Sequence, residues 1–160
     1  MSIKLSKRLS KIVEMCEPCE TIIDVGTDHG KVPITVANLG LAKNVIAIDN
    51  KKGPLAACEE NANLYMTNRD CSFKTLLCNG LEKVDKTVES GIIITGIGYD
   101  AMSEIIKDIN DYNFKYLILS PHTKINEFVN LLKELNIDIV DHVEILDCKK
   151  NYHLIKAKHI

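Results

Sequence analysis

The chain has 160 residues, of which 46% are hydrophobic and 26% charged, and its formal net charge at pH 7 is −2. This length suits one domain with a full core, so we expect a single domain over residues 1–160, with a helix in residues 1–18 packed on it. No apolar run is long enough to span a membrane and no signal peptide opens the chain, which predicts a cytoplasmic protein without a membrane partner.

The cysteines argue against a metal centre. Of the six, Cys16 and Cys19 have the C-x-x-C spacing, and no second such pair completes a zinc site. Reduced thiols and no bound metal are therefore expected.

Residues 2–16 predict an amphipathic helix. Its apolar stripe consists of Leu5, Leu9, Ile12, Val13 and Cys16. Four basic residues recur at i, i+3, i+4 and i+7 on another face: Lys4, Lys7, Arg8 and Lys11. This basic face is a candidate RNA-binding surface that contacts phosphates. Its alternative is a solvated face on a helix that covers the core.

After Pro18, an apolar strand over residues 21–25 ends in a glycine turn, and a helix follows over residues 31–39. This is how the first strand of a doubly wound sheet delivers a ligand to the sheet edge. Gly26 permits the sharp turn, and Gly30 is expected to let the next helix pack near the strand.

The turn carries acids where a dinucleotide-binding loop carries glycine. Asp28 occupies the place of the second glycine, which a pyrophosphate needs, and Asp24 stands just before the turn. Two carboxylates repel a pyrophosphate but attract a cationic ligand. S-adenosylmethionine carries a sulfonium and an ammonium group and no phosphate, so the loop favours a methyl donor as cofactor.

A second strand over residues 44–48 ends in Asp49, followed by Asn50. An acid about 20 residues beyond the glycine turn binds ribose hydroxyls in nucleotide-type sites. A helix opens at Gly53-Pro54, and a third strand over residues 72–77 leads to Asn79-Gly80. This pair either receives the adenine edge of a cofactor or forms a simple turn. Residues 82–90 are expected to form a short helix.

A fourth strand over residues 91–95 ends in a second glycine loop, Gly96-Ile97-Gly98. If the sheet order reverses between the first and fourth strands, the two glycine loops lie side by side, where ligands bind in such sheets. The next helix has an apolar face made of Met102, Ile105, Ile106 and Ile109. Tyr99 at its start either stacks on a bound base or packs.

The last part of the chain predicts a strand, a helix and a hairpin. The strand over residues 116–119 leads to a loop in which His122 faces either the substrate or solvent, and Thr123 is expected to cap a helix. Strands over residues 137–146 and 152–158 form a β-hairpin. The whole pattern predicts an α/β fold: a mostly parallel, Rossmann-like seven-stranded sheet with one antiparallel strand and helices on both faces, the plan of class I methyltransferases.

Several stretches together resemble the bacterial tRNA adenine N1-methyltransferases of the TrmK type, which act on the adenine at tRNA position 22. The matching stretches are Leu5-Ser6-Lys7-Arg8-Leu9, Asp24-Val25-Gly26-Thr27-Asp28-His29 with Pro33, Gly96-Ile97-Gly98, Leu119-Ser120-Pro121, and the hairpin ending with Tyr152. The resemblance implies an S-adenosylmethionine-dependent methyltransferase with tRNA as substrate, working as a monomer or weak homodimer.

The resemblance and the loops together give the predicted site. The predicted cofactor-binding residues are Asp24, Gly26, Thr27, Asp28, Gly30, Asp49, Asn50, Asn79, Gly80, Gly96, Ile97 and Gly98. The residues expected to face the target base are Asp28, His29 and His122. Asp28 is the candidate that binds the exocyclic amine of the adenine.

The chain departs from the family pattern at three positions and at its end. Tyr99 replaces a glycine, Asn79 replaces an acid, and His122 replaces an asparagine. The resemblance further implies that the helical C-terminal extension of the family is missing here. Two alternatives stay open on these grounds: a diverged cofactor-binding module or partner subunit without catalysis, and a methyltransferase for small molecules.

Overall fold

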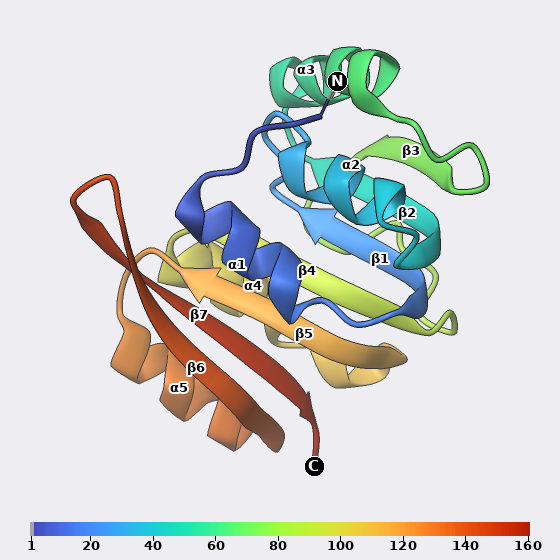
Figure 1. The fold of residues 1–160 in the computed structure, drawn as a ribbon. Coiled ribbons are helices and arrows are strands. Elements are labelled where there is room, and N and C mark those ends of the chain that lie inside the picture. Colours follow the sequence, from blue (N-terminus) through green and yellow to red (C-terminus); the bar gives the residue numbers. More distant parts are fainter. Residues whose placement is uncertain (1) are drawn as a thin grey trace.

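The computed structural model describes residues 2–160, in which a seven-stranded sheet carries helices on both faces (Figure 1). In chain order the elements are α1 (Lys7–Met15), β1 (Cys19–Val25), α2 (Lys31–Asn38), β2 (Ala42–Asp49), α3 (Lys52–Tyr65), β3 (Ser72–Leu77), β4 (Ser90–Ile97), α4 (Tyr99–Ile106), the 3₁₀ turn η1 (Ile109–Asp111), β5 (Phe114–Pro121), α5 (Ile125–Glu134), β6 (Ile137–Asp147) and β7 (Lys150–His159).

The strand order is β3-β2-β1-β4-β5-β7-β6; β7 runs antiparallel to both β5 and β6, and the other neighbouring pairs are parallel. The predicted mostly parallel sheet with one antiparallel strand is confirmed. The order reverses at β1, which lies between β2 and β4. Val25 pairs with Ile48 of β2 and with Ile94 of β4, so the three strands end at the same edge. This edge is the switch point where α/β sheets bind ligands.

The sheet is buried on both sides, as expected for parallel strands. Ile22 of β1 packs with α1 and α2, whereas Ile23 and Val25 point to the opposite face and pack with α4 and α5. Helix α3 packs against α2 and the outer strands β2 and β3. No helix within residues 2–160 is long and apolar enough to cross a membrane.

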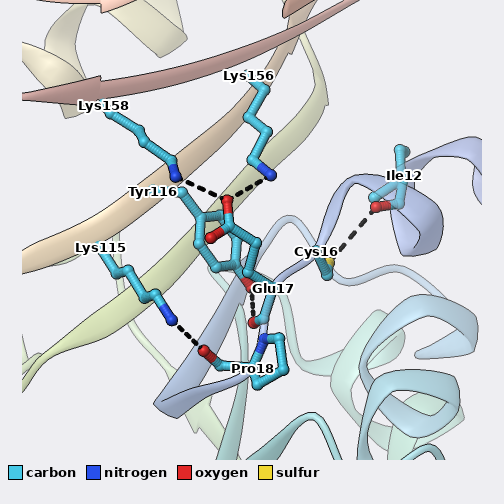
Figure 2. Close-up of polar contacts among 8 residues, drawn as sticks. All are labelled: Ile12, Cys16, Glu17, Pro18, Lys115, Tyr116, Lys156 and Lys158. Atoms are coloured by element: carbon cyan, nitrogen blue, oxygen red, sulfur yellow. Dashed lines mark hydrogen bonds and ion pairs between the residues drawn. The ribbon is translucent and has the colours of Figure 1, made fainter. Parts of the chain in front are cut away.

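A polar cluster attaches the segment between α1 and β1 to the opposite half of the sheet (Figure 2). The Glu17 carboxylate forms ion pairs with Lys156 and Lys158 of β7, and the latter distance is 2.9 Å. The Tyr116 hydroxyl donates to the Glu17 carbonyl at 3.1 Å, and the Lys115 ammonium donates to the Pro18 carbonyl. These contacts hold α1 beside the end of the chain.

The first helix is shorter than the predicted span of residues 2–16. Ser6 is its N-cap, because the Ser6 hydroxyl accepts a hydrogen bond from the Leu9 N–H at 3.2 Å. Lys4 therefore lies before the helix, and Lys11 pairs with Glu14 at 3.4 Å. The expectation of four basic residues on one helical face is wrong.

The short helix predicted over residues 82–90 is also absent; that segment forms turns, and β4 already begins at Ser90. The Asp85 carboxylate accepts hydrogen bonds from both the backbone N–H and the hydroxyl of Thr87, at 2.9 and 2.7 Å. Such a local turn competes with helical hydrogen bonding.

Thr123 does not cap α5 as predicted. The N-cap position belongs to Lys124, whose φ is +53°, and its side chain forms no capping hydrogen bond. The Thr123 hydroxyl instead accepts a hydrogen bond from the N–H of Tyr99, the first residue of α4, at 3.1 Å. Thr123 thus joins the β5–α5 loop to the β4–α4 loop.

Candidate active site

A cavity of about 530 Å³ opens at the carboxyl edge of the sheet, between the loops that follow β1, β2 and β4. Its walls consist of Arg8, Leu9, Asp24, Val25, Gly26, Thr27, Asp28, His29, Lys31, Val32, Ile48, Asp49, Asn50, Lys51, Pro54, Cys78, Gly80, Thr95, Gly96, Ile97, Ala101, Ile105 and His122. The volume is typical of a small-molecule or cofactor site.

The turn after β1 is held against β2 and β4. The N–H groups of Gly26 and Thr27 both donate to the Ile48 carbonyl, at 2.9 and 3.1 Å. Gly26 has φ +78°, and a Cβ there would stand 3.3 Å from the Thr95 carbonyl oxygen. The absence of a side chain at Gly26 therefore lets the loops after β1 and β4 lie side by side, as the sequence predicted for its two glycine loops.

Gly30 has a different role from the predicted one. A Cβ on Gly30 would stand 2.5 Å from the Cys58 sulfur of α3, so the close approach is between two helices and not between α2 and β1. Gly30 does not line the cavity. Two further predicted cofactor residues, Asn79 and Gly98, also lie outside the wall, and the Asn79 side chain is exposed.

Asp24 is the buried acid of the cavity, with 4% of its surface exposed. Burial raises the pKa of its carboxyl group to about 7; the nearby Thr27 hydroxyl works against this shift, and the negative charge of Asp49 adds to it. Beside it, the Thr27 hydroxyl is buried without a hydrogen-bond partner among residues 2–160. A buried carboxyl group and an unsatisfied hydroxyl in one cavity wall indicate a site arranged for a polar ligand.

Asp28 and His29 lie at the exposed rim of the same cavity. Their side chains are 77% and 62% exposed, and the Asp28 carboxylate lies 3.7 Å from the His29 Nε2. Asp28 has φ +52°, a left-handed conformation that non-glycine residues adopt at some cost. Of the two acids, Asp24 thus lies buried in the cavity wall and Asp28 lies at the cavity opening.

Asp49 ends β2 on the neighbouring wall. Its carboxylate accepts a hydrogen bond from the Lys51 N–H at 3.0 Å, which fixes the side chain in the turn before α3. Asn50 lines the same wall. The apolar wall opposite includes Ile105 of α4, and a Cβ on Gly80 would stand 2.9 Å from its Cγ1. The sequence predicted Ile105 on the apolar face of this helix but gave it no place in the site, because apolar spacing does not distinguish a core residue from a cavity wall.

His122 lies on the cavity wall that β5 supplies. Its backbone N–H donates to the Ile97 carbonyl at 2.8 Å, which fixes the β5 loop against the second glycine loop. Burial lowers the pKa of the imidazole below its usual value, and the positive charges of Lys150 and Arg8 lower it further. His122 is therefore neutral at pH 7, with one donor and one acceptor nitrogen.

Of the four predicted RNA-binding residues, Arg8 reaches the cavity wall. Its guanidinium lies 4.7 Å from the centre of the Tyr152 ring, and its backbone N–H donates to Asp147 at 3.1 Å. The loop residues of the hairpin were not assigned to the site from the sequence. The packing of α1 on the hairpin, which places Tyr152 against Arg8, joins residues far apart in the chain.

The described part of the chain contains no cluster of metal-ligating side chains. Within residues 2–160, no three histidine, cysteine or acidic side chains are placed to hold a metal ion. All six cysteines are free thiols.

Comparisons with known proteins agree with this geometry. The chain is 25% identical over 158 residues to the Bacillus subtilis tRNA (adenine(22)-N(1))-methyltransferase, covering 98% of this chain and 66% of that protein, so it spans about two thirds of the length of the curated relative. The M. capricolum TrmK structure, in complex with S-adenosyl-homocysteine, is 26% identical with a TM-score of 0.84, over 96% of this chain and 68% of that one.

A second solved structure, Sp1610 of Streptococcus pneumoniae in complex with S-adenosyl-L-methionine, is 25% identical with a TM-score of 0.88, over 98% of this chain and 73% of that one. The Rossmann-like methyltransferase fold is thereby confirmed. The model of the family described as "Methyltransferase domain" matches residues 5–155. Since this match spans nearly the whole chain, the protein belongs to the methyltransferase domain family.

Proposed function

We propose that this protein transfers the methyl group of S-adenosylmethionine to N1 of an adenine in tRNA. The observation that carries the proposal is the acidic cavity at the switch point of the sheet, which Asp24, Asp28 and Asp49 all line. The named activity of the Bacillus subtilis relative supports tRNA as the substrate and its adenine 22 as the target.

The residues present fit the proposed cofactor. Three carboxylates attract the sulfonium and ammonium groups, and the buried Thr27 hydroxyl has hydrogen-bonding capacity left to use. Asp49, at the end of β2, is placed to bind the ribose hydroxyls. Gly80 and Ile105 offer an apolar surface for an adenine ring.

S-adenosylmethionine supplies a methyl carbon already activated by the adjacent sulfonium. Adenine N1 has a free lone pair, so the protein needs no strong base and mainly aligns the base and excludes water. Asp28, at the rim, is positioned to accept a hydrogen bond from the exocyclic amine, which orients N1 and stabilises the charge that develops on the ring. His29 and neutral His122 offer further polar contacts to the base.

A stacked adenine must leave its stack to reach this cavity, at a cost of a few kcal/mol. Arg8 lines the cavity and lies beside the Tyr152 ring, so a cation and an aromatic ring next to the site can offset that cost through phosphate and stacking contacts.

The proposal is tested by transfer of a labelled methyl group from S-adenosylmethionine to unmodified tRNA transcripts, with cofactor affinity measured by calorimetry on the same preparation. We expect transfer that disappears when the target adenine is replaced by guanine. Cofactor binding without transfer to any tRNA would contradict the proposal and favour a small-molecule substrate or a partner subunit without catalysis. Absence of cofactor binding would show that the acidic loop has another role.

A further inference from the structure

A second hollow of about 230 Å³ adjoins the first cavity. It lies between the loop after β5 and the start of β7, and its wall contains Pro121, His122, Thr123, Lys124, Ile125, Lys150, Asn151, Tyr152 and His153. His122 belongs to both walls, so the two hollows adjoin at this residue. A water molecule takes about 30 Å³ in the liquid, so this hollow has room for a phosphate group and its surroundings.

Two lysines, Lys124 and Lys150, line this second hollow, and each lies over an aromatic ring. Lys150 lies 5.4 Å from the centre of the Tyr152 ring and Arg8 lies 4.7 Å from it, while Lys124 lies 5.6 Å from the centre of the Tyr99 ring. The chain as a whole has a net charge of −2. The positive charge at this opening is therefore a local feature, and its position beside the cavity calls for an anionic ligand there.

The hairpin holds these groups in a fixed place. Cys148 and Lys149 both have positive φ, 51° and 64°, and form the two-residue turn between Asp147 and Lys150, which pair across the strands. Lys150 and Tyr152 are two residues apart on β7, so they share one face of the hairpin. The Arg8 N–H bond to Asp147 joins that turn to α1.

We propose that the second hollow binds the backbone phosphate next to the target adenine, with Lys124 and Lys150 as its ligands and Tyr152 as a stacking surface for an adjacent base. This inference rests on the proposed function. A base that enters the first cavity carries its own phosphates, and these must pass the shared His122 wall. The combination of cations with partly exposed aromatic rings favours RNA over an acidic protein, because stacking on aromatic rings is a property of bases.

The test compares the full-length wild-type chain with a Lys124→Gln/Lys150→Gln variant. The matched control, Lys74→Gln, removes a charge from an exposed lysine on β3, at the opposite edge of the sheet. Affinity for a labelled, unmodified tRNA transcript is measured between 50 and 200 mM salt. We expect the double variant to bind about tenfold more weakly, with a log–log salt slope smaller by about 1, since each neutralised phosphate contributes about 0.9 and the two lysines share one phosphate. Calorimetric affinity for S-adenosylmethionine should stay within twofold of the wild type.

A second pair of variants addresses stacking. Tyr152→Phe should keep tRNA affinity, and Tyr152→Ala should lower it by about tenfold, in line with the loss of one stacked base. An unchanged affinity and salt slope in the double lysine variant, equal to those of Lys74→Gln, would overturn the inference and leave the hollow to an acidic protein partner. Loss of S-adenosylmethionine binding would also overturn it, by giving the lysines a structural role.

The proposed function is judged separately, on the wild type. If the wild type binds S-adenosylmethionine but neither binds nor methylates tRNA, the proposed function fails and the phosphate site fails with it. If the wild type methylates tRNA and the lysine variants match the control, only the phosphate site fails.

Discussion

At the scale of single residues, Asp24 combines two opposing requirements. Its burial at the end of β1 places a carboxylate where a cationic ligand needs it, yet the same burial penalises the charged form. A pKa of about 7 leaves roughly half of the carboxyl groups protonated at pH 7. Ligand binding and proton release are therefore coupled.

We expect the affinity for S-adenosylmethionine to rise about tenfold from pH 6 to pH 8 and to level off above pH 8, because the ionised Asp24 is the form that attracts the cation. Calorimetry at three pH values, in buffers of different ionisation enthalpy, measures both the affinity and the proton released. An affinity that stays flat across this range would show that Asp24 does not bind the charged part of the cofactor.

Asp24→Asn should raise stability while it removes cofactor binding. The folded-state pKa lies above the unfolded value, so the stability associated with protonated Asp24 is complete below about pH 4 and is lost as the pH rises through 7. Asparagine cannot ionise, so the variant should gain about 2–4 kcal/mol of unfolding free energy at pH 8 and little at pH 4. Denaturant unfolding at both pH values measures this, with exposed Asp28→Asn as the control that should change little.

Asp28→Ala should keep cofactor affinity within a few-fold and lower the rate of methyl transfer by about a hundredfold, the usual cost of removing one hydrogen bond at the reacting group. Asp28→Asn is the matched variant, because asparagine tolerates the positive φ and keeps a carbonyl acceptor. Single-turnover kinetics measures the rate. Wild-type transfer by the alanine variant would remove Asp28 from the mechanism.

At the scale of elements, the packing of β4 on β5 depends on a missing side chain. A Cβ on Gly91 would stand 2.3 Å from the Tyr116 ring, which is fully buried. Gly91→Ala should therefore destabilise the protein by about 3 kcal/mol, as expected for an overpacked core. In a Tyr116→Leu background the same change should cost clearly less. Equal costs in the two backgrounds, measured by denaturant unfolding, would show that the ring is not the obstacle.

The strands and their mostly parallel arrangement could be predicted because the apolar runs are short and most of them lead to a glycine, an acid or a proline. The reversal of strand order entered the prediction only as a condition, because strand neighbours are set by tertiary packing. Local competition explains the errors. Residues 82–90 are polar enough for a helix, but the Asp85 carboxylate binds its own turn. The N-terminal basic residues have a helical spacing from Lys4 onward. The helix begins only after its N-cap Ser6, however, so Lys4 lies outside it.

The site residues that could be predicted are those that stand at the ends of strands. Those that reach the site through contacts between distant segments could not be predicted. Asp24, Gly26, Asp49 and Gly96 stand at strand ends, and parallel strands bring these ends together. Asn79 follows a strand end too, but its side chain is exposed outside the cavity, with Cys78 and Gly80 on the wall instead. Tyr152 lies against Arg8 through the packing of α1 on the hairpin, which local spacing does not encode.

At the scale of the whole molecule, the cavity joins loops from β1, β2 and β4, so one ligand contacts segments that otherwise separate on unfolding. S-adenosylmethionine at a hundredfold excess over its Kd should add about 2.7 kcal/mol to stability and raise Tm by about 5–10 °C. Thermal scans with and without the cofactor measure this shift. Asp24→Asn serves as the control without a shift, and a comparable rise in that variant would contradict the proposed binding mode.

The position of β7 also determines when the sheet can close. Because β7 lies between β5 and β6, β6 has no neighbour in the sheet until residues 150–159 have left the ribosome. Glu17, made early, likewise waits for Lys156 and Lys158. The nascent chain therefore exposes the edge of β5 throughout synthesis of α5 and β6, and the second hollow, which includes Tyr152, forms only after β7 has joined the sheet.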